Sequence, residues 1–165
     1  MGLLIVFLQA GFHGVDALAD PLGWVLVLAG VVPLRDRLPH GDVALWLASL
    51  ALVVSVPLFV PAVRSQLSAS GQWGASVPQT AFCLVLAGAL ATVCERAGDR
   101  RARWFRVLRT GFAVLLAGPV LLYGGHVDSL AVPLAVVSVA ADVALVWFTF
   151  AVSRRLLDPT PAPVE

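Results

Sequence analysis

Charged side chains are missing from long stretches of this chain and crowded into short segments between them. Residues 43–63 and 112–123 contain no Asp, Glu, Lys or Arg, whereas six arginines lie between Arg96 and Arg109. A soluble domain needs charges interspersed along its elements, and such domains contain about 25% charged residues. Here 13% of the residues are charged and 59% are hydrophobic. The chain is therefore predicted to be an integral membrane protein of the α-helical class.

The apolar segments predict an all-α, polytopic transmembrane bundle of about six short helices. As one helix, residues 2–34 would be about 50 Å long, whereas the hydrocarbon core is about 30 Å thick. Asp20 and Pro21 break this block, because aspartate caps exposed amides and proline suits the first helical position. A re-entrant hairpin over residues 2–35 is the alternative. The predicted helices span residues 2–18, 21–35, 42–63, 77–95, 107–123 and 129–152, within a single domain at 1–157 that a disordered tail at 158–165 follows.

Arginine counts in the connections predict the orientation. Two arginines follow the second predicted helix, six separate the fourth and fifth, and two follow the sixth, whereas the opposite connections contain only Arg64. Because basic residues stay on the cytoplasmic side, both termini are predicted to lie inside. If residues 2–35 instead form a re-entrant hairpin, five spans remain and the amino terminus lies outside.

The net charge and the choice of basic residue bear on partners and location. A net charge of +1 predicts no nucleic-acid partner. All 11 basic residues are arginine, and the chain contains no lysine or asparagine, which indicates a GC-rich bacterial genome and hence a bacterial plasma membrane. A cleaved signal peptide is not expected, because no basic segment precedes Leu3 to Leu8 and because His13 and Asp16 interrupt the apolar run.

Ionisable groups inside membrane helices are costly and mark candidate sites. Along the first predicted helix, polar residues are spaced four, three and four apart, which places them in a polar stripe on one helical face. The residues of this stripe are Gln9, His13, Asp16 and Asp20. Asp142 lies near the middle of the sixth, where a lone carboxylate costs about 2.5–3.5 kcal/mol unless it is protonated, paired or hydrated. Gln9 and Ser138 are expected to hydrogen-bond neighbouring helices. The predicted polar intramembrane site comprises Gln9, His13, Asp16, Ser138 and Asp142.

Further candidates lie at the predicted outer surface, namely Asp20, His126 and Asp128. Imidazole and carboxylate groups suit a divalent cation, but their spacing here matches no established ligand signature. The candidate metal ligands are His13, Asp16, Asp20 and Asp128. Cys83 and Cys94 are interpreted as small apolar residues of one helix, too far apart to bridge.

The arginine-rich segment is predicted to lie along the anionic inner leaflet and to contact lipid headgroups. It also contains Trp104 and Phe105 between its basic residues. Small residues at helical spacing elsewhere predict close helix packing within the chain, in a homo-oligomer or with a membrane-complex partner. The arginines concerned are Arg96, Arg100, Arg101, Arg103, Arg106 and Arg109.

The segment DALADPLGW, from Asp16 to Trp24, contains an aspartate, then Asp-Pro, then Gly and an aromatic. It resembles a hairpin between the first two spans of small uncharacterised bacterial multi-spanning membrane proteins. The likeness covers about residues 9–35 of the chain. It implies a break between the first two helices and no particular activity.

Three functions fit these patterns. The first is a non-enzymatic membrane protein, either a small transport or channel-like module or a subunit of a membrane complex, with Asp142 and His13 in a polar interior. The alternative is a membrane-embedded, metal-dependent enzyme that acts on a lipid-linked or hydrophobic substrate at the outer leaflet, with Asp16, Asp20 and Asp128 binding the cation. The third is a structural or assembly partner, in which the polar residues only hydrogen-bond neighbouring helices to one another.

Overall fold

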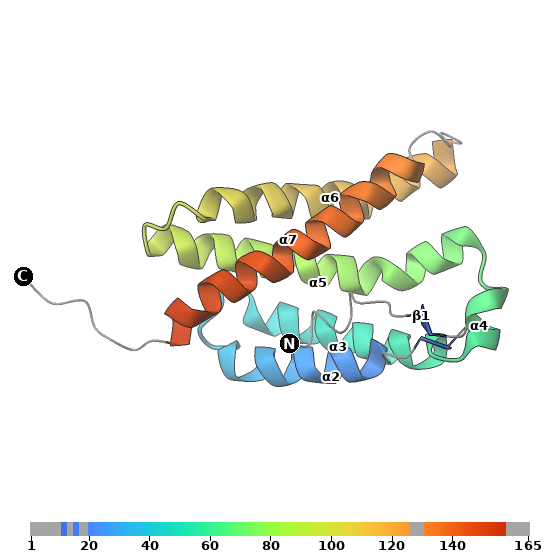
Figure 1. The fold of residues 1–165 in the computed structure, drawn as a ribbon, viewed down its shortest axis with the longest axis horizontal. Helices are drawn as coiled ribbons and strands as arrows, with labels where there is room; N and C mark the ends of the chain where they lie inside the picture. The colour runs from blue at the N-terminus through green and yellow to red at the C-terminus, as the bar shows by residue number, and fades with distance from the viewer. Residues whose placement is uncertain (1–10, 13–14, 17–19, 126–130, 158–165) are drawn as a thin grey trace, which may run out of the picture.

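The computed structural model describes residues 11–12, 15–16, 20–125 and 131–157. Helices make up almost all of these residues. Within these ranges the prediction of an all-helical fold class is confirmed, apart from one pair of short strands (Figure 1). The elements are β1 (Gly11–Phe12), β2 (Val15–Asp16), α2 (Asp20–Val31), the 3-10 helix η1 (Val32–Leu34), α3 (Gly41–Leu58), α4 (Pro61–Gln66), α5 (Ala69–Arg96), α6 (Ala102–Gly125) and α7 (Ala131–Leu157).

The predicted helix over residues 2–18 is wrong wherever the structure describes this segment. Gly11–Phe12 and Val15–Asp16 pair as antiparallel strands, with Gly11 opposite Asp16. Glycine lowers helix propensity by about 1 kcal/mol relative to alanine, and the sequence has glycine at positions 11 and 14, next to the β-branched Val15. The helical spacing that placed Asp16 in a polar stripe therefore does not apply at that residue. The rest of the predicted helix lies outside the described residues.

The second and third predicted helices are found with one change. α2 and η1 together cover Asp20–Leu34, close to the predicted 21–35. The third predicted helix, residues 42–63, is divided into α3 and α4. Proline removes a backbone donor and disfavours helical conformation in the residue before it, so Pro61 starts a new helix instead of only bending the old one.

α5 and α6 begin well before their predicted starts. α5 starts at Ala69, where the Ser68 hydroxyl caps the helix by accepting a hydrogen bond from the Gly71 N–H at 3.2 Å. Pro78, close to the expected start, lies inside this helix. α6 starts at Ala102, within the arginine-rich segment, because arginine is itself a good helix former.

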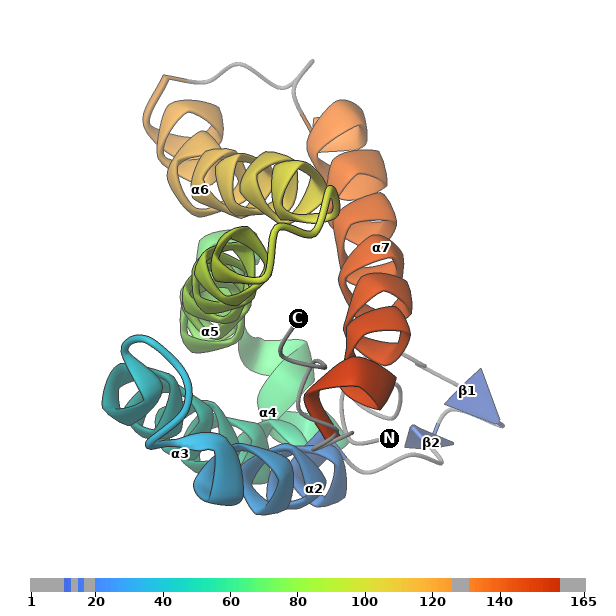
Figure 2. The same cartoon turned by 90° about the vertical axis from the view of Figure 1, so that its left-hand side faces the viewer.

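Successive helices pack on one another and form an open arc (Figure 2). α2 packs on α3, α3 on α5, α5 on α6 and α6 on α7. The side chains between them are apolar and close-packed. Those with almost no exposed surface are Trp24, Phe82, Cys83, Phe105, Phe112 and Leu145.

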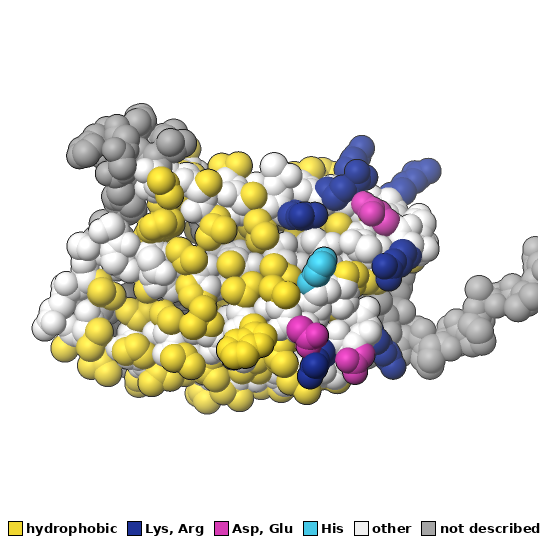
Figure 3. Space-filling model, turned by 180° about the vertical axis from the view of Figure 1, so that it is seen from behind, with side chains coloured by type: hydrophobic (Ala, Val, Ile, Leu, Met, Phe, Trp, Pro, Cys, Tyr) yellow, Lys and Arg dark blue, Asp and Glu magenta, His cyan; other side chains and the backbone are white. Residues whose placement is uncertain are grey.

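Charged side chains gather at one end of the arc, whereas apolar side chains cover the face seen in Figure 3. This end, called the arginine end below, contains the connection from η1 to α3, with Arg35 and Arg37 in its sequence, and the connection between α5 and α6 (Figure 1). The connection through α4 lies at the opposite end (Figure 1). The second to sixth predicted helices therefore have their arginine-flanked ends at the same end of the molecule.

Three described helices are long and apolar enough to cross a membrane, at Gly41–Leu58, Ser70–Arg96 and Val132–Val152. Pro21–Leu34 is a shorter apolar helix. Large apolar side chains on these helices point outward; Trp46 is 77% exposed and Trp147 74%. Soluble monomers rarely expose apolar surface on this scale. The fold is thus consistent with a membrane-embedded protein, while the number of spans and the positions of both termini stay predictions.

Candidate functional site

A cavity of about 220 Å³ lies between α2, α3 and α5, in the half of the arc away from the arginine end. Water occupies about 30 Å³ per molecule in the liquid, so this polar cavity can hold several. Polar groups line one side of it, and the indole of Trp24 lines another. The full lining is Trp24, Ala51, Val54, Ser55, Leu58, Gln72, Ala75, Ser76 and Gln79.

α5 supplies most of the polar groups because Gln72, Ser76 and Gln79 are spaced four and three apart and share one helical face. The Ser76 hydroxyl donates to the Trp73 carbonyl at 2.8 Å, and the Gln72 amide donates to the Leu67 carbonyl at 3.3 Å. The Gln79 amide has no hydrogen-bond partner among the described residues. It is therefore available to water or to a polar solute in the cavity.

The opposite wall of the polar cavity is held rigidly. The Trp24 side chain is 2% exposed, and its ring meets that of Phe82 edge to face, with centroids 5.5 Å apart. Such aromatic pairs add about 0.5–1.5 kcal/mol beyond their buried area. On α3, the Ser55 hydroxyl donates to the Leu52 carbonyl at 2.8 Å, which leaves its oxygen able to accept a further hydrogen bond.

Asp142 of α7 lies beyond the cavity, next to α5. One turn along the same face of α5 from Gln79 is the buried Cys83, which is close enough to Asp142 for an electrostatic interaction. The Asp142 side chain is half-buried and makes no hydrogen bond or ion pair with any described residue. The half-buried Ser138 lies one turn from it on α7. The polar face of α5 thus leads from the cavity toward the one carboxylate in the middle of α7.

Towards the arginine end, the interior beyond Asp142 is apolar. Leu86 and Leu90 of α5 are buried, and Phe105 of α6 and Leu145 of α7 have no exposed surface. Thr149, near this level, donates its hydroxyl to the Leu145 carbonyl at 2.7 Å and so satisfies itself within its own helix. Among the described residues, polar groups therefore line the cavity in one half of the arc, and buried apolar side chains, called the apolar seal below, fill the interior towards the arginine end.

Most of the other predicted site residues fall outside what the structure describes. Gln9, His13, His126 and Asp128 lie outside the described residues, as does most of the first predicted polar stripe. The backbones of Asp16 and Asp20 are placed in β2 and at the start of α2, without their side chains. Among the described residues, no group of three or more His, Cys, Asp and Glu side chains could hold a metal ion. The divalent cation stays a prediction.

The sequence-based prediction missed the residues of the polar cavity. Gln72, Ser76 and Gln79 give a signal, since they repeat at helical spacing. That signal was hidden because the helix was expected to start at residue 77, which left two of the three in a loop. Ser55, on α3, is a single hydroxyl among apolar residues and gives no such signal.

Six arginines border the connection between α5 and α6. Gly98 ends α5 with a left-handed backbone (φ +66°), and the Asp99 N–H donates back to the Cys94 carbonyl at 2.8 Å. Arg101 then ties this connection to α7, donating from Nη1 to the Ala151 carbonyl at 2.9 Å. Arg106 pairs with Glu95 at 3.3 Å, and the stem of Arg109 lies against Gly88. Apart from the half-buried Arg101, these arginines are exposed, as headgroup contacts must be.

No protein-family model, no curated protein and no solved structure matches the chain. The resemblance of residues 9–35 to a bacterial membrane hairpin therefore stays a prediction. Function has to be argued from the geometry.

Proposed function

We propose that the chain is a multi-pass membrane protein of the bacterial plasma membrane and a small, non-enzymatic transport or channel-like module. In this proposal a small polar solute or cation enters from the outer face, passes the polar cavity and reaches Asp142. The observation that carries it is the half-buried Asp142 carboxyl, which has no hydrogen-bond partner among the described residues and adjoins the cavity-lining face of α5.

The depth of Asp142 supports the proposal. It lies ten residues from either end of the apolar window Val132–Val152, or about 15 Å along the helix in each direction. A carboxylate at the bilayer centre costs about 2.5–3.5 kcal/mol unless it is protonated, paired or hydrated. Water that enters past Gln79 would supply the hydration. A group kept at this cost is more useful as a binding group than as a packing contact.

The direction of entry follows from the arginines. Basic connections stay on the cytoplasmic side, so the arginine end is the inner end in this proposal. The polar cavity, in the other half of the arc, then opens toward the outer face. A solute would meet Gln72 and Ser76 first, then Gln79, and finally Asp142.

A role as a subunit of a membrane complex is a second form of the same proposal, since the apolar seal at the arginine end would then open only with a partner. The metal-dependent enzyme predicted as the alternative rests on Asp16, Asp20 and Asp128, none of whose side chains the structure describes. It stays a prediction from the sequence.

Flux measurements in vesicles test the proposal. The purified protein is reconstituted in liposomes loaded with a pH-sensitive dye, and proton or alkali-cation flux is driven by an imposed potential. Asp142→Asn keeps the size of the side chain and removes its charge, so we expect the flux to fall about tenfold or more. Asp36→Asn, the same change at an exposed position of the arginine end, should leave the flux unchanged.

A second pair of variants tests the path. Gln79→Leu replaces a polar lining group of the cavity by an apolar side chain of similar size and should lower the flux, whereas Gln66→Leu, at an exposed position outside the cavity, should not. Circular dichroism and gel filtration confirm that each variant is folded. Flux equal to that of empty vesicles for the unaltered protein, or equal flux for Asp142→Asn, would show that the module proposal is wrong.

A further inference from the structure

We propose that the arginine end carries a binding site for one anionic phospholipid of the inner leaflet. In this site the phosphate contacts Arg100 and Arg103, and one acyl chain lies along α7. The inference uses the membrane placement given above but not the role of Asp142.

The first observation is a pocket of about 650 Å³ at the connection between α5 and α6, called the headgroup pocket below. It contains four arginines and one aspartate, which gives a net charge of +3. A phosphodiester has the complementary charge, and arginine binds phosphate oxygens through charge-assisted hydrogen bonds. The lining residues are Asp99, Arg100, Arg101, Ala102, Arg103, Trp104 and Arg106.

Two of the four arginines already have protein partners. Arg101 donates to the Ala151 carbonyl, and Arg106 pairs with Glu95. Asp99 accepts from the Arg101 N–H at 2.9 Å. Arg100 and Arg103 pair with no carboxylate among the described residues, and the Arg103 guanidinium lies 5.5 Å from the centre of the Trp104 ring. These two guanidinium groups are the ones available to a phosphate.

The second observation is a shallow, open apolar groove of about 820 Å³ whose described lining lies entirely on one face of α7. Its described lining runs from Ala135 to Phe148, which corresponds to about 20 Å of helix. One leaflet of the hydrocarbon core is about 15 Å thick, so the groove is long enough for an acyl chain. The described lining is Ala135, Val136, Val139, Ala140, Val143, Ala144, Trp147 and Phe148.

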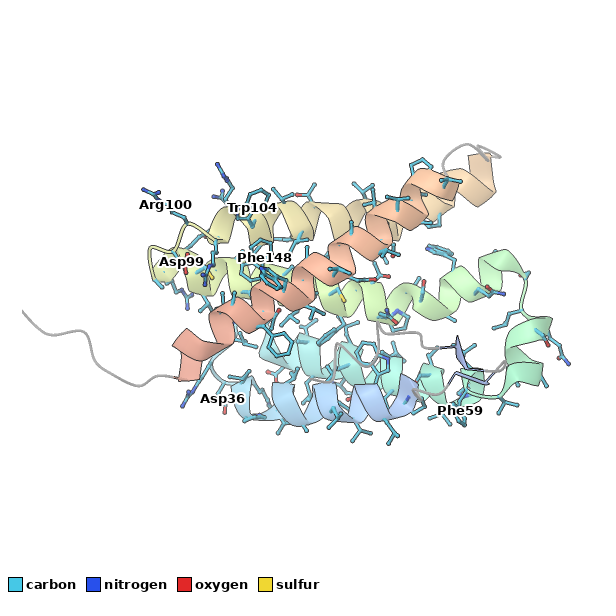
Figure 4. The ribbon with its side chains drawn as sticks, viewed as in Figure 1. Asp36, Phe59, Asp99, Arg100, Trp104 and Phe148 are labelled. Atoms are coloured by element: carbon cyan, nitrogen blue, oxygen red, sulfur yellow. The ribbon has the colours of Figure 1, made fainter. Side chains whose placement is uncertain are left out.

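The pocket and the groove meet at one aromatic contact. Trp104 lines the headgroup pocket and Phe148 lines the groove, and their rings stack with centroids 6.1 Å apart and planes 17° apart. Figure 4 shows Trp104 on α6 and Phe148 on α7 near each other, with Asp99 and Arg100 towards the end of the arc. A ligand with a phosphate and a long apolar tail fits both surfaces, whereas a soluble anion uses only the pocket. A lipid is therefore the occupant that accounts for both.

Lipid binding to the purified full-length protein in neutral detergent tests this site. Native mass spectrometry counts bound dioleoyl-phosphatidylglycerol and measures its apparent Kd, with dioleoyl-phosphatidylcholine as the zwitterionic comparison and inorganic phosphate as the headgroup without a tail. We expect one molecule of phosphatidylglycerol per chain, bound at least about tenfold more tightly than phosphatidylcholine, and no displacement by millimolar phosphate.

Matched variants separate a built site from general surface charge. Each arginine near an anionic lipid contributes about a fivefold change in binding, so Arg100→Gln with Arg103→Gln should weaken phosphatidylglycerol binding about 30-fold. Arg35→Gln with Arg37→Gln makes the same charge change at exposed positions of the arginine end outside the headgroup pocket and should change it less than about twofold. Ala140→Phe fills the groove and should weaken binding, whereas Ala113→Phe, exposed on α6, should not.

Three results would overturn the inference. Equal losses for the two arginine pairs would mean that charge anywhere at this end suffices. Displacement by phosphate would mean an anion site without a tail groove. Equal affinity for phosphatidylcholine would remove the role of the arginines. Because the assay contains no membrane potential and no flux, a failure here is distinct from a failure of Asp142→Asn in vesicles.

Discussion

Gly41→Ala tests the close approach between the start of α3 and the connection that joins it to η1. Gly41 is the first residue of α3 and directly follows the connection from η1. A Cβ at this position would overlap the backbone carbonyl oxygen of Arg35 and lie 2.8 Å from its carbonyl carbon. Real Cβ atoms essentially never approach other heavy atoms this closely, so something must move. The atoms in the way belong to the backbone, and no rotamer change can relieve the overlap.

The expected cost follows from that geometry. Overpacking typically costs about 1–3 kcal/mol, and alanine returns at most about 1 kcal/mol through its higher helix propensity. Gly30→Ala on α2 is the matched control, because nothing lies within 4 Å of the added methyl group. It should gain about 0.5–1 kcal/mol. The two variants should therefore differ by about 0.5–4 kcal/mol in the free energy of unfolding.

Reversible unfolding in mixed detergent micelles with increasing dodecyl sulfate measures this difference. Circular dichroism follows helix content. In a background with the other four tryptophans replaced by phenylalanine, the fluorescence of the buried Trp24 follows the packing of α2 on α3 and α5. Gly41→Ala should also lose the Trp24 signal at a lower detergent fraction than Gly30→Ala. Equal stability of the two variants, within about 0.5 kcal/mol, would refute the close approach of α3 to Arg35.

The remaining predictions concern the hydrogen bond from Arg101 to the Ala151 carbonyl, called the clasp below, and the orientation in the membrane. Arg101→Gln removes the charged donor to the Ala151 carbonyl and should cost about 1.5–3 kcal/mol in the same unfolding assay. Arg100→Gln, at an exposed neighbouring position, should cost less than about 0.5 kcal/mol, and equal losses would contradict the clasp. With both native cysteines replaced by alanine, Ser76→Cys in the polar cavity should react with a membrane-impermeant maleimide added outside intact cells. Asp36→Cys at the arginine end should react only after permeabilisation, and the reverse pattern would invert the orientation.

The helical class could be predicted from the sequence because the segregation of charges is a property of composition. The helix boundaries were harder to predict from the sequence, because a helix can extend beyond the apolar segment that lies in the hydrocarbon core. α6 begins among arginines and α5 begins eight residues before its expected start, in each case with a polar first segment that lipid solvation does not require. The helix predicted for the amino-terminal segment was wrong for another reason. Apolar composition predicts burial in lipid but does not distinguish a helix from a strand when glycines interrupt it.

The candidate site could be predicted only where a single residue carried the argument. Asp142 stands out in the sequence because a carboxylate in an apolar helix is costly wherever the helix packs. Its neighbour Cys83 could not be predicted, because the approach of α7 to this residue of α5 depends on how the helices pack. Gln9 and His13, which the sequence analysis groups with Asp142 in one polar site, both lie outside the described residues. Their grouping with Asp142 stays a prediction.

The two ends of α7 place different demands on the proposed module. At the arginine end α7 is held by the Arg101 hydrogen bond to Ala151 and by the contacts of Phe148 with Trp104 and with Phe105, whose centroid lies 5.9 Å away. At mid-helix, Asp142 lies close to Cys83 of α5, which is one turn along that helix from the cavity-lining Gln79. In the proposed module, a solute that reaches Asp142 from outside would next meet the buried apolar side chains of Phe105 and Leu145, and it would pass them only if α7 moved relative to α6. A lipid seated on both the headgroup pocket and the groove would contact these same two helices. Binding that holds them together would keep this layer closed and would thereby couple the lipid composition of the inner leaflet to passage beyond Asp142.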